Sequence, residues 1–178
     1  MNAQPENHLQ PKRCKESLVI KTGRVFPNDM NNHATLFGGK LMSLIDEVSS
    51  ISAMRHCRNN VVTASTDSVD FLRPIHQFDS VCLESFVTYT GNTSMEVFVK
   101  VISEDLFTGE RHVAATSFIT FVSMDMEGRP MPVPAIIPET DEEKLLHESA
   151  PERSALRKQR RIASKALAAK LSTQKYWE

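Results

Sequence analysis

Residues 41–57 read LMSLIDEVSSISAMRHC, and this stretch decides the fold. Its apolar side chains recur every three or four residues, which is the spacing of one face of an α-helix: Leu41, Leu44, Ile45, Val48, Ile51 and Met54. The spacing predicts a helix of about four to five turns that ends near Cys57. It is the only strong helical pattern in the first 138 residues.

Segments with β character lie on both sides of this helix. SLVIKTGRVF (17–26) precedes it and stops at Pro27. Four longer segments rich in Val, Ile, Phe and Thr follow: NVVTASTDSVDFLRPI (60–75), DSVCLESFVTYTG (79–91), SMEVFVKVISEDL (94–106) and RHVAATSFITFVSMD (111–125). Their connectors are short, as hairpin connections are. The order predicts a strand, a helix and four strands in an antiparallel meander, an α+β fold in which the sheet wraps one central helix.

The two ends of the chain differ from this domain, which we place at residues 17–138. Residues 1–16 are polar and predict a disordered leader, while GRPMPVPAIIP (128–138) suits an extended crossing segment. Residues 139–178 form a charged tail, acidic at first and basic from 153 to 175. A thin apolar stripe predicts a helix that docks loosely or on a partner subunit. We expect its charges to be solvated; contact with phosphates is the alternative.

Composition excludes several classes of function. The net charge is −1 and 40% of residues are apolar, so neither a strongly basic nucleic-acid binder nor a disordered chain is indicated. Cys14, Cys57 and Cys82 form no CxxC pair, which argues against a disulfide framework or a structural zinc site. MNAQPENHLQPKRCKES (1–17) lacks a signal-peptide core, and no window is long and apolar enough for a membrane span. We therefore predict a cytoplasmic protein with no membrane insertion, nucleic-acid partner or metal.

A pair of glycines stands at the entrance of the predicted helix, in DMNNHATLFGGKLMSLID (29–46). A helix N-terminus presents N–H groups without intrahelical acceptors and a partial positive charge, which favour an oxygen that becomes negative. Gly38 and Gly39 carry no side chain, so a ligand can approach this backbone closely. A tight turn between helix and sheet is the structural alternative.

Two polar side chains near this entrance are candidates for chemistry. Asp46 falls beside Met42, Ser49 and Ala53 on the helical wheel, at the flank of the apolar stripe. An ordinary exposed carboxylate is the alternative for Asp46, and turn formation is the alternative for Asn31. His33 has no visible acidic or cysteine partner. The chain also lacks GxSxG, HExxH, P-loop and GxGxxG motifs, which argues against the usual serine hydrolases, zinc proteases, nucleotide kinases and dinucleotide enzymes.

Three runs together resemble the single-domain bacterial acyl-CoA thioesterases of the hotdog fold, relatives of cytosolic acyl-CoA hydrolases: NDMNNHATLFGGKLMSLIDEVSSISAMRH, VTASTDSVDFLRPI and GNTSMEVFVKV with TGERHVAATSFITFV. The resemblance covers residues 17–138. It implies an antiparallel sheet around one long helix, dimers that pair through their sheets, and assembly of a homohexamer as a trimer of dimers.

The same resemblance assigns roles to residues. It implies that Asn31 and Asp46 are catalytic and meet across the dimer interface, and that Gly38 and Gly39 hold the thioester carbonyl. Coenzyme A would lie beside the second and third strands, with these candidate contacts: Phe71, Arg73, Asn92, Thr93 and Ser94. No cofactor is implied beyond coenzyme A as part of the substrate.

The function predicted from the sequence is hydrolysis of acyl-CoA to a carboxylic acid and coenzyme A. Asp46 would act as general base on water, or as the nucleophile, and Asn31 would orient the water or the thioester. A free Asp is a weak base at neutral pH, so we expect burial to raise the pKa of Asp46. A non-catalytic acyl-CoA sensor is the main alternative; a 3-hydroxyacyl thioester dehydratase is disfavoured because no histidine lies at the helix start.

Overall fold

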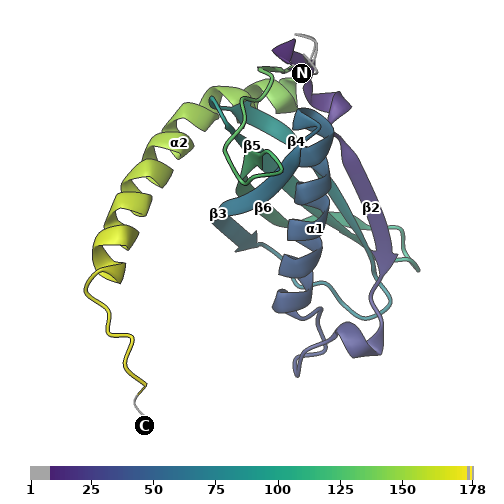
Figure 1. Cartoon of the computed structure of the whole chain (residues 1–178). Helices are drawn as coiled ribbons and strands as arrows, with labels where there is room; N and C mark the ends of the chain where they lie inside the picture. Colours follow the sequence, from purple (N-terminus) through teal and green to yellow (C-terminus); the bar gives the residue numbers. More distant parts are fainter. Residues whose placement is uncertain (1–8, 176, 178) are drawn as a thin grey trace.

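The computed structural model describes residues 9–175 and 177, so part of the leader lies outside the described residues. One five-stranded antiparallel sheet has the order β2-β4-β5-β6-β3. Its strands are β2 (Val19–Arg24), β3 (Asn60–Phe71), β4 (Ser80–Thr90), β5 (Ser94–Glu104) and β6 (Arg111–Met124). The helix α1 (Gly38–Cys57) lies across one face of this sheet (Figure 1). The predicted α+β fold with a long central helix is confirmed.

The predicted four-strand meander is wrong in one respect. Strands β4, β5 and β6 form a meander, but β3 pairs with β6 and therefore lies at the far edge, while β2 pairs with β4. The segment between β3 and β4 is consequently a connection across the sheet and not a hairpin. Short connectors favour hairpins, yet only tertiary packing decides which strand occupies an edge.

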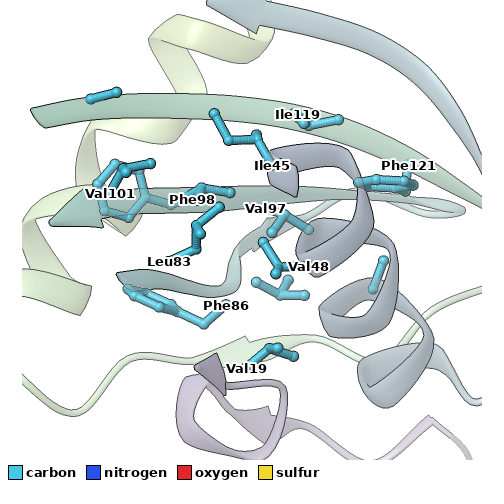
Figure 2. Packing of buried hydrophobic residues seen from close by; sticks show 14 of the residues in the cluster. Val19, Ile45, Val48, Leu83, Phe86, Val97, Phe98, Val101, Ile119 and Phe121 are labelled. Atoms are coloured by element: carbon cyan, nitrogen blue, oxygen red, sulfur yellow. The ribbon is translucent and has the colours of Figure 1, made fainter. Parts of the chain in front are cut away.

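The core lies between α1 and the sheet. Ile45 and Val48 of α1 pack beside Val97, Ile119 and Phe121 (Figure 2), and all five are at most 2% exposed. Two buried serine contacts tie the helix to β4, because the Ser85 hydroxyl donates to the Val48 carbonyl at 3.0 Å and the Ser52 hydroxyl donates to the Ser85 carbonyl at 3.0 Å. Burial of a continuous apolar face therefore fixes how α1 sits on the sheet.

The N-terminal segment is more ordered than the sequence predicts. Residues 12–16 were expected to be disordered, but β1 (Lys12–Arg13) pairs with β7 (Ile136–Ile137), and a 3-10 turn follows at Cys14–Glu16. Cys14 is fully buried, and this burial raises the pKa of its thiol to about 12. One buried cysteine thus anchors a segment whose composition is polar. The proline-rich stretch 128–138 contains no helix, as expected, and includes the short strand β7.

The tail is helical, as predicted. Helix α2 (Asp141–Ala168) begins with a capping box, in which the Thr140 hydroxyl accepts from the Glu143 N–H and the Glu143 carboxylate accepts from the Thr140 N–H. Side chains alternate along β5, so Phe98 lies on the face opposite to the α1-facing Val97. Helix α2 lies against this second face, where the Arg153 guanidinium stands 4.1 Å from the centroid of the Phe118 ring. The last turns stand clear of the sheet (Figure 1). The expectation that the tail's charges are solvated is wrong for Arg153 and Arg157, which make ion pairs with the sheet.

Candidate active site

The entrance of α1 faces a pocket. The loop before it is held by two backbone contacts, from the Phe37 N–H to the Asp29 carbonyl and from the Leu36 N–H to the Ile75 carbonyl, each at 2.8 Å. The helix then begins at Gly38, so its first N–H groups have no intrahelical acceptor. A pocket of about 410 Å³ is lined by Asn31, Thr35, Leu36, Gly38, Leu41, Phe71, Leu72, Arg73, Pro74 and Ile75. Partial positive charge and open space thus coincide.

The two glycines have different surroundings. A Cβ on Gly38 would lie 3.5 Å from the Phe71 ring, which is ordinary contact, and would occupy space at the pocket wall. A Cβ on Gly39 would lie 2.5 Å from Phe37 Cε1, so the ring would have to move. Gly38 therefore keeps the pocket open, and Gly39 allows the Phe37 ring to lie against the helix.

Asn31 is half-buried in the loop wall of this pocket. Its Nδ2 donates to the Thr35 hydroxyl at 3.0 Å, and its Oδ1 accepts from the backbone N–H groups of His33 at 2.8 Å and Thr35 at 3.3 Å. These bonds fix the amide beside the helix entrance. His33 is exposed and supplies only its backbone N–H to this arrangement.

Asp46 lies two turns into α1, and its carboxylate is exposed in the single protomer. Its Oδ1 accepts a hydrogen bond from the Thr63 hydroxyl of β3 at 3.1 Å. The predicted burial of Asp46 is therefore not found in the single protomer, and Asp46 is not part of the pocket wall that contains Asn31. The arrangement leaves its second carboxylate oxygen open to an incoming molecule.

Thr63 was missed by the sequence reasoning. Threonine is common in strands, so its occurrence in β3 carried no signal. A pointer did exist in the run TASTDS (63–68), which is unusually polar for a strand. It places hydroxyls and a carboxylate on one sheet edge.

The predicted coenzyme A contacts fall into two groups. Phe71 and Arg73 line the pocket with Asn31 and Gly38. Asn92, Thr93 and Ser94 instead form the β4–β5 turn, where the Thr93 and Asn92 carbonyls accept from the N–H groups of Ser123 and Val133. Ser94 is the first residue of β5, whereas Phe71 aligns through Ala115 of β6 with Val101 of β5. Ser94 and Val101 are seven residues apart, so the two groups are separated by about 23 Å along the strand direction. One protomer therefore does not bring the two groups together.

A larger hollow of about 650 Å³ lies at the other end of α1. It is lined by Ile51, Met54, Arg55, Arg58, Asn59, Asn60, Met124, Asp125, Met126 and Met131, and it includes none of the predicted site residues. Among the described residues, no cluster of three or more His, Cys, Asp or Glu could hold a metal ion. No helix in the described part of the chain is long and apolar enough to cross a membrane.

Comparison with known proteins identifies relatives of this arrangement. A family model described as the thioesterase superfamily matches residues 33–108. The chain is 65% identical over 164 residues to the uncharacterized acyl-CoA thioester hydrolase YkhA of Bacillus subtilis strain 168, with 92% of this chain and 95% of that protein covered.

Solved structures are similar over the same length. The acyl-CoA hydrolase of Staphylococcus aureus, in complex with butyryl coenzyme A, coenzyme A and coenzyme A disulfide, is 47% identical with a TM-score of 0.86, covering 89% of this chain and 98% of that one. An apo-hexameric acyl-CoA thioesterase is 48% identical with a TM-score of 0.83, covering 85% and 97%. Alanine variants of an asparagine, an aspartate and a threonine of the S. aureus enzyme have been solved, and these positions have the spacing of Asn31, Asp46 and Thr63.

Proposed function

This chain belongs to the thioesterase superfamily as an acyl-CoA thioester hydrolase, and from that premise we propose that Asp46 and Asn31 carry the hydrolysis. Water attacks the thioester carbonyl while Asp46 accepts its proton; the C–S bond then breaks, and the proton passes from Asp46 to the leaving sulfur to give a carboxylic acid and coenzyme A as thiol. The observation that carries this assignment is the Asp46 carboxylate, held by Thr63 at 3.1 Å with one oxygen still open. Direct attack by Asp46, through a mixed anhydride, would use the same open oxygen.

The N–H groups at the start of α1 stabilise the oxyanion in this proposal. The helix starts at the pocket that Gly38 and Asn31 line, and a well-placed donor to a developing oxyanion is worth about 3 kcal/mol. Asn31 is held by its loop contacts and orients the water or the thioester. No metal or redox cofactor takes part in these steps.

Substitution Gly38→Ala tests this use of the helix entrance. The new methyl group makes only ordinary contact with Phe71, so we expect the thermal midpoint to stay within about 2 °C of wild type, since alanine is the better helix former. The methyl group occupies the pocket wall, so we expect kcat/KM for acyl-CoA to fall by about 10-fold or more. Equal kcat/KM in the variant and wild type would show that the carbonyl binds elsewhere.

The complete site is proposed to need two protomers. Strand β3 is 12 residues long and pairs with β6 alone among the described strands, so its outer edge is free for pairing. Antiparallel pairing of two β3 edges puts the start of one strand beside the end of the other. Val62, near the start of β3, aligns through Val122 with Ser94, so the Asn92–Ser94 turn lies at the start of β3. Phe71 and Arg73 lie at the end of β3, so this turn of one protomer would approach Phe71 and Arg73 of the other.

This pairing also accounts for the exposed Asp46. The second protomer would cover the carboxylate and bring it to the Asn31 loop. Coenzyme A would then contact Phe71 and Arg73 from one chain and Asn92, Thr93 and Ser94 from the other. The hollow of about 650 Å³ at the far end of α1 would adjoin this site, and four methionines in its wall would offer adaptable apolar surface to an acyl group: Met54, Met124, Met126 and Met131.

A homo-oligomer follows from this proposal, with dimers assembled as a trimer of dimers, the homohexamer that the likeness to a hexameric thioesterase supports. We also propose a cytoplasmic location, in keeping with three free cysteines among the described residues. The domain would span residues 17–138, with α2 as an addition to it.

Thiol release from acyl-CoA esters of graded chain length is the test of this function. We expect the purified oligomer to release free coenzyme A from at least one ester, with a chain-length preference set by the acyl space. Binding of every ester without thiol release would support the non-catalytic sensor and overturn the hydrolase. Hydration of a 2-enoyl-CoA, or loss of water from a 3-hydroxyacyl-CoA, would indicate the dehydratase instead.

A further inference from the structure

A buried carboxylate meets the C-terminal helix on the sheet face opposite α1. The Glu96 side chain of β5 is 0% exposed. Arg153 of α2 donates to its Oε1 from Nη2 at 2.7 Å, and Arg157 donates to its Oε2 from Nη1 at 3.2 Å. The Thr88 hydroxyl donates a further bond at 3.0 Å. Two charges of α2 thus satisfy a carboxylate that could not be buried alone.

The same helix also holds an acidic residue of β3. Arg157 and Arg160 donate to the two carboxylate oxygens of Asp67, which is only 11% exposed. Arg160 additionally donates to the Asp67 carbonyl at 3.1 Å and to the Ser65 hydroxyl at 2.9 Å. We call this set the arginine clamp: Arg153, Arg157 and Arg160 of α2 with Glu96 and Asp67.

Asp67 is an extra residue in its strand. In the ladder between β3 and β6, Thr63, Ser65, Thr66 and Ser68 pair with consecutive residues, so Ala64 and Asp67 have no partner. Each unpaired residue is a β-bulge, which redirects the neighbouring side chains and increases the local twist. The first bulge directly follows Thr63, whose hydroxyl binds Asp46. The arginine clamp therefore binds the second bulge at Asp67, four residues after Thr63, which contacts the proposed base Asp46.

We propose that the arginine clamp positions Asp46, by fixing the double bulge of β3 and through it the Thr63 hydroxyl. This inference rests on the proposed function of Asp46. Because Ala64 and Asp67 have no partner in the ladder with β6, this ladder alone constrains the bulges weakly, and a shift by one residue would turn Thr63 to the other face. Arg157 bridges both carboxylates and is the positioning residue whose loss breaks the link between the bulge at Asp67 and the buried Glu96.

Steady-state kinetics of Arg157→Ala test this role, with Arg161→Ala as the matched control. Arg161 lies on the same helix, is exposed and pairs with no described residue. We expect kcat to fall by about 10-fold or more in Arg157→Ala with KM within about 3-fold, since a misplacement near 1 Å can cost 100-fold in rate. The kcat of Arg161→Ala should match that of wild type. Arg157→Lys should recover part of the lost kcat, because lysine keeps the positive charge but not the planar guanidinium that bonds two carboxylates at once.

A double-mutant cycle with Thr63→Ala separates positioning from general structural damage. If Arg157 acts through Thr63, adding Arg157→Ala to Thr63→Ala should lower kcat by less than about 2-fold further. Fully additive losses, or an Arg157→Ala kcat within 2-fold of wild type in a folded and assembled enzyme, would overturn the proposal.

Hydrogen exchange supplies a readout that does not depend on activity. Amides of residues 64–68 should exchange at least about 10-fold faster in Arg157→Ala than in Arg161→Ala. Unchanged exchange there would overturn the clamp even if wild type proved inactive. An inactive wild type with faster exchange in Arg157→Ala would instead overturn the proposed hydrolysis and leave the clamp as a device that orders β3.

Discussion

Substitution Asp46→Asn is expected to lower kcat for acyl-CoA hydrolysis by about 100-fold or more. Asparagine has nearly the shape of aspartate and can still accept the Thr63 hydrogen bond, but it neither takes a proton from water nor attacks a carbonyl. Binding of a non-hydrolysable acyl-CoA analogue should stay within a few-fold, because the pocket at the start of α1 is unchanged. Thiol release and analogue titration on matched oligomers measure the two quantities.

Glu47→Gln is the control for this prediction. Glu47 is the next residue on α1 and pairs with Lys21 at 2.6 Å on the surface, so its loss should leave kcat unchanged. Label found in Asp46 after a single turnover in ¹⁸O-labelled water indicates attack by the carboxylate and hydrolysis of the anhydride at the Asp46 carbon, because a general base exchanges no oxygen with water. Hydrolysis by Asp46→Asn at more than a tenth of the wild-type rate would remove Asp46 from the catalytic role.

The sequence predicts local elements well and pairing poorly. Spacing of apolar residues located α1, and β-branched runs bounded by turn residues located the strands, because both patterns record burial of one face. The edge position of β3 could not be read in the same way, since strand pairing depends on contacts distant along the chain. The bulges at Ala64 and Asp67 likewise appear only when β3 is aligned with β6.

The same contrast holds for the candidate site: the sequence indicates several of its residues but not the contacts between distant elements. Gly38, Phe71 and Arg73 were proposed from the sequence and lie with Asn31 around one pocket. The Thr63 contact to Asp46 was missed, because it joins a helix to a strand edge. The arginines of α2 were expected to be solvated, since a charged helix with a thin apolar stripe does not indicate that Glu96 and Asp67 of the sheet lie opposite it. Ion pairs of this kind depend on where α2 packs on the sheet, which its own sequence does not determine.

A second large effect is expected on stability, from Glu96→Gln. The substitution keeps the side-chain volume but leaves the guanidinium groups of Arg153 and Arg157 without the carboxylate that they share, and removing one partner of a buried pair costs about 3–5 kcal/mol. For a domain of this size, each kcal/mol lowers the midpoint by about 2–4 °C, so we expect a fall of about 10 °C. Thermal unfolding at matched protomer concentration measures it, because oligomers make the midpoint depend on concentration.

Glu142→Gln provides the contrast, because Glu142 of α2 also forms an ion pair with the sheet, through Lys100 of β5. Its bond to Lys100 at 2.9 Å is half-exposed, so water screens it and solvates either partner after the loss, and we expect a change below about 1 kcal/mol. The difference between the two variants therefore isolates the effect of burial from that of charge. A Glu96→Gln midpoint as close to wild type as that of Glu142→Gln would mean that Arg153 and Arg157 reach solvent at little cost when α2 lifts from the sheet, and that the helix is a detachable element.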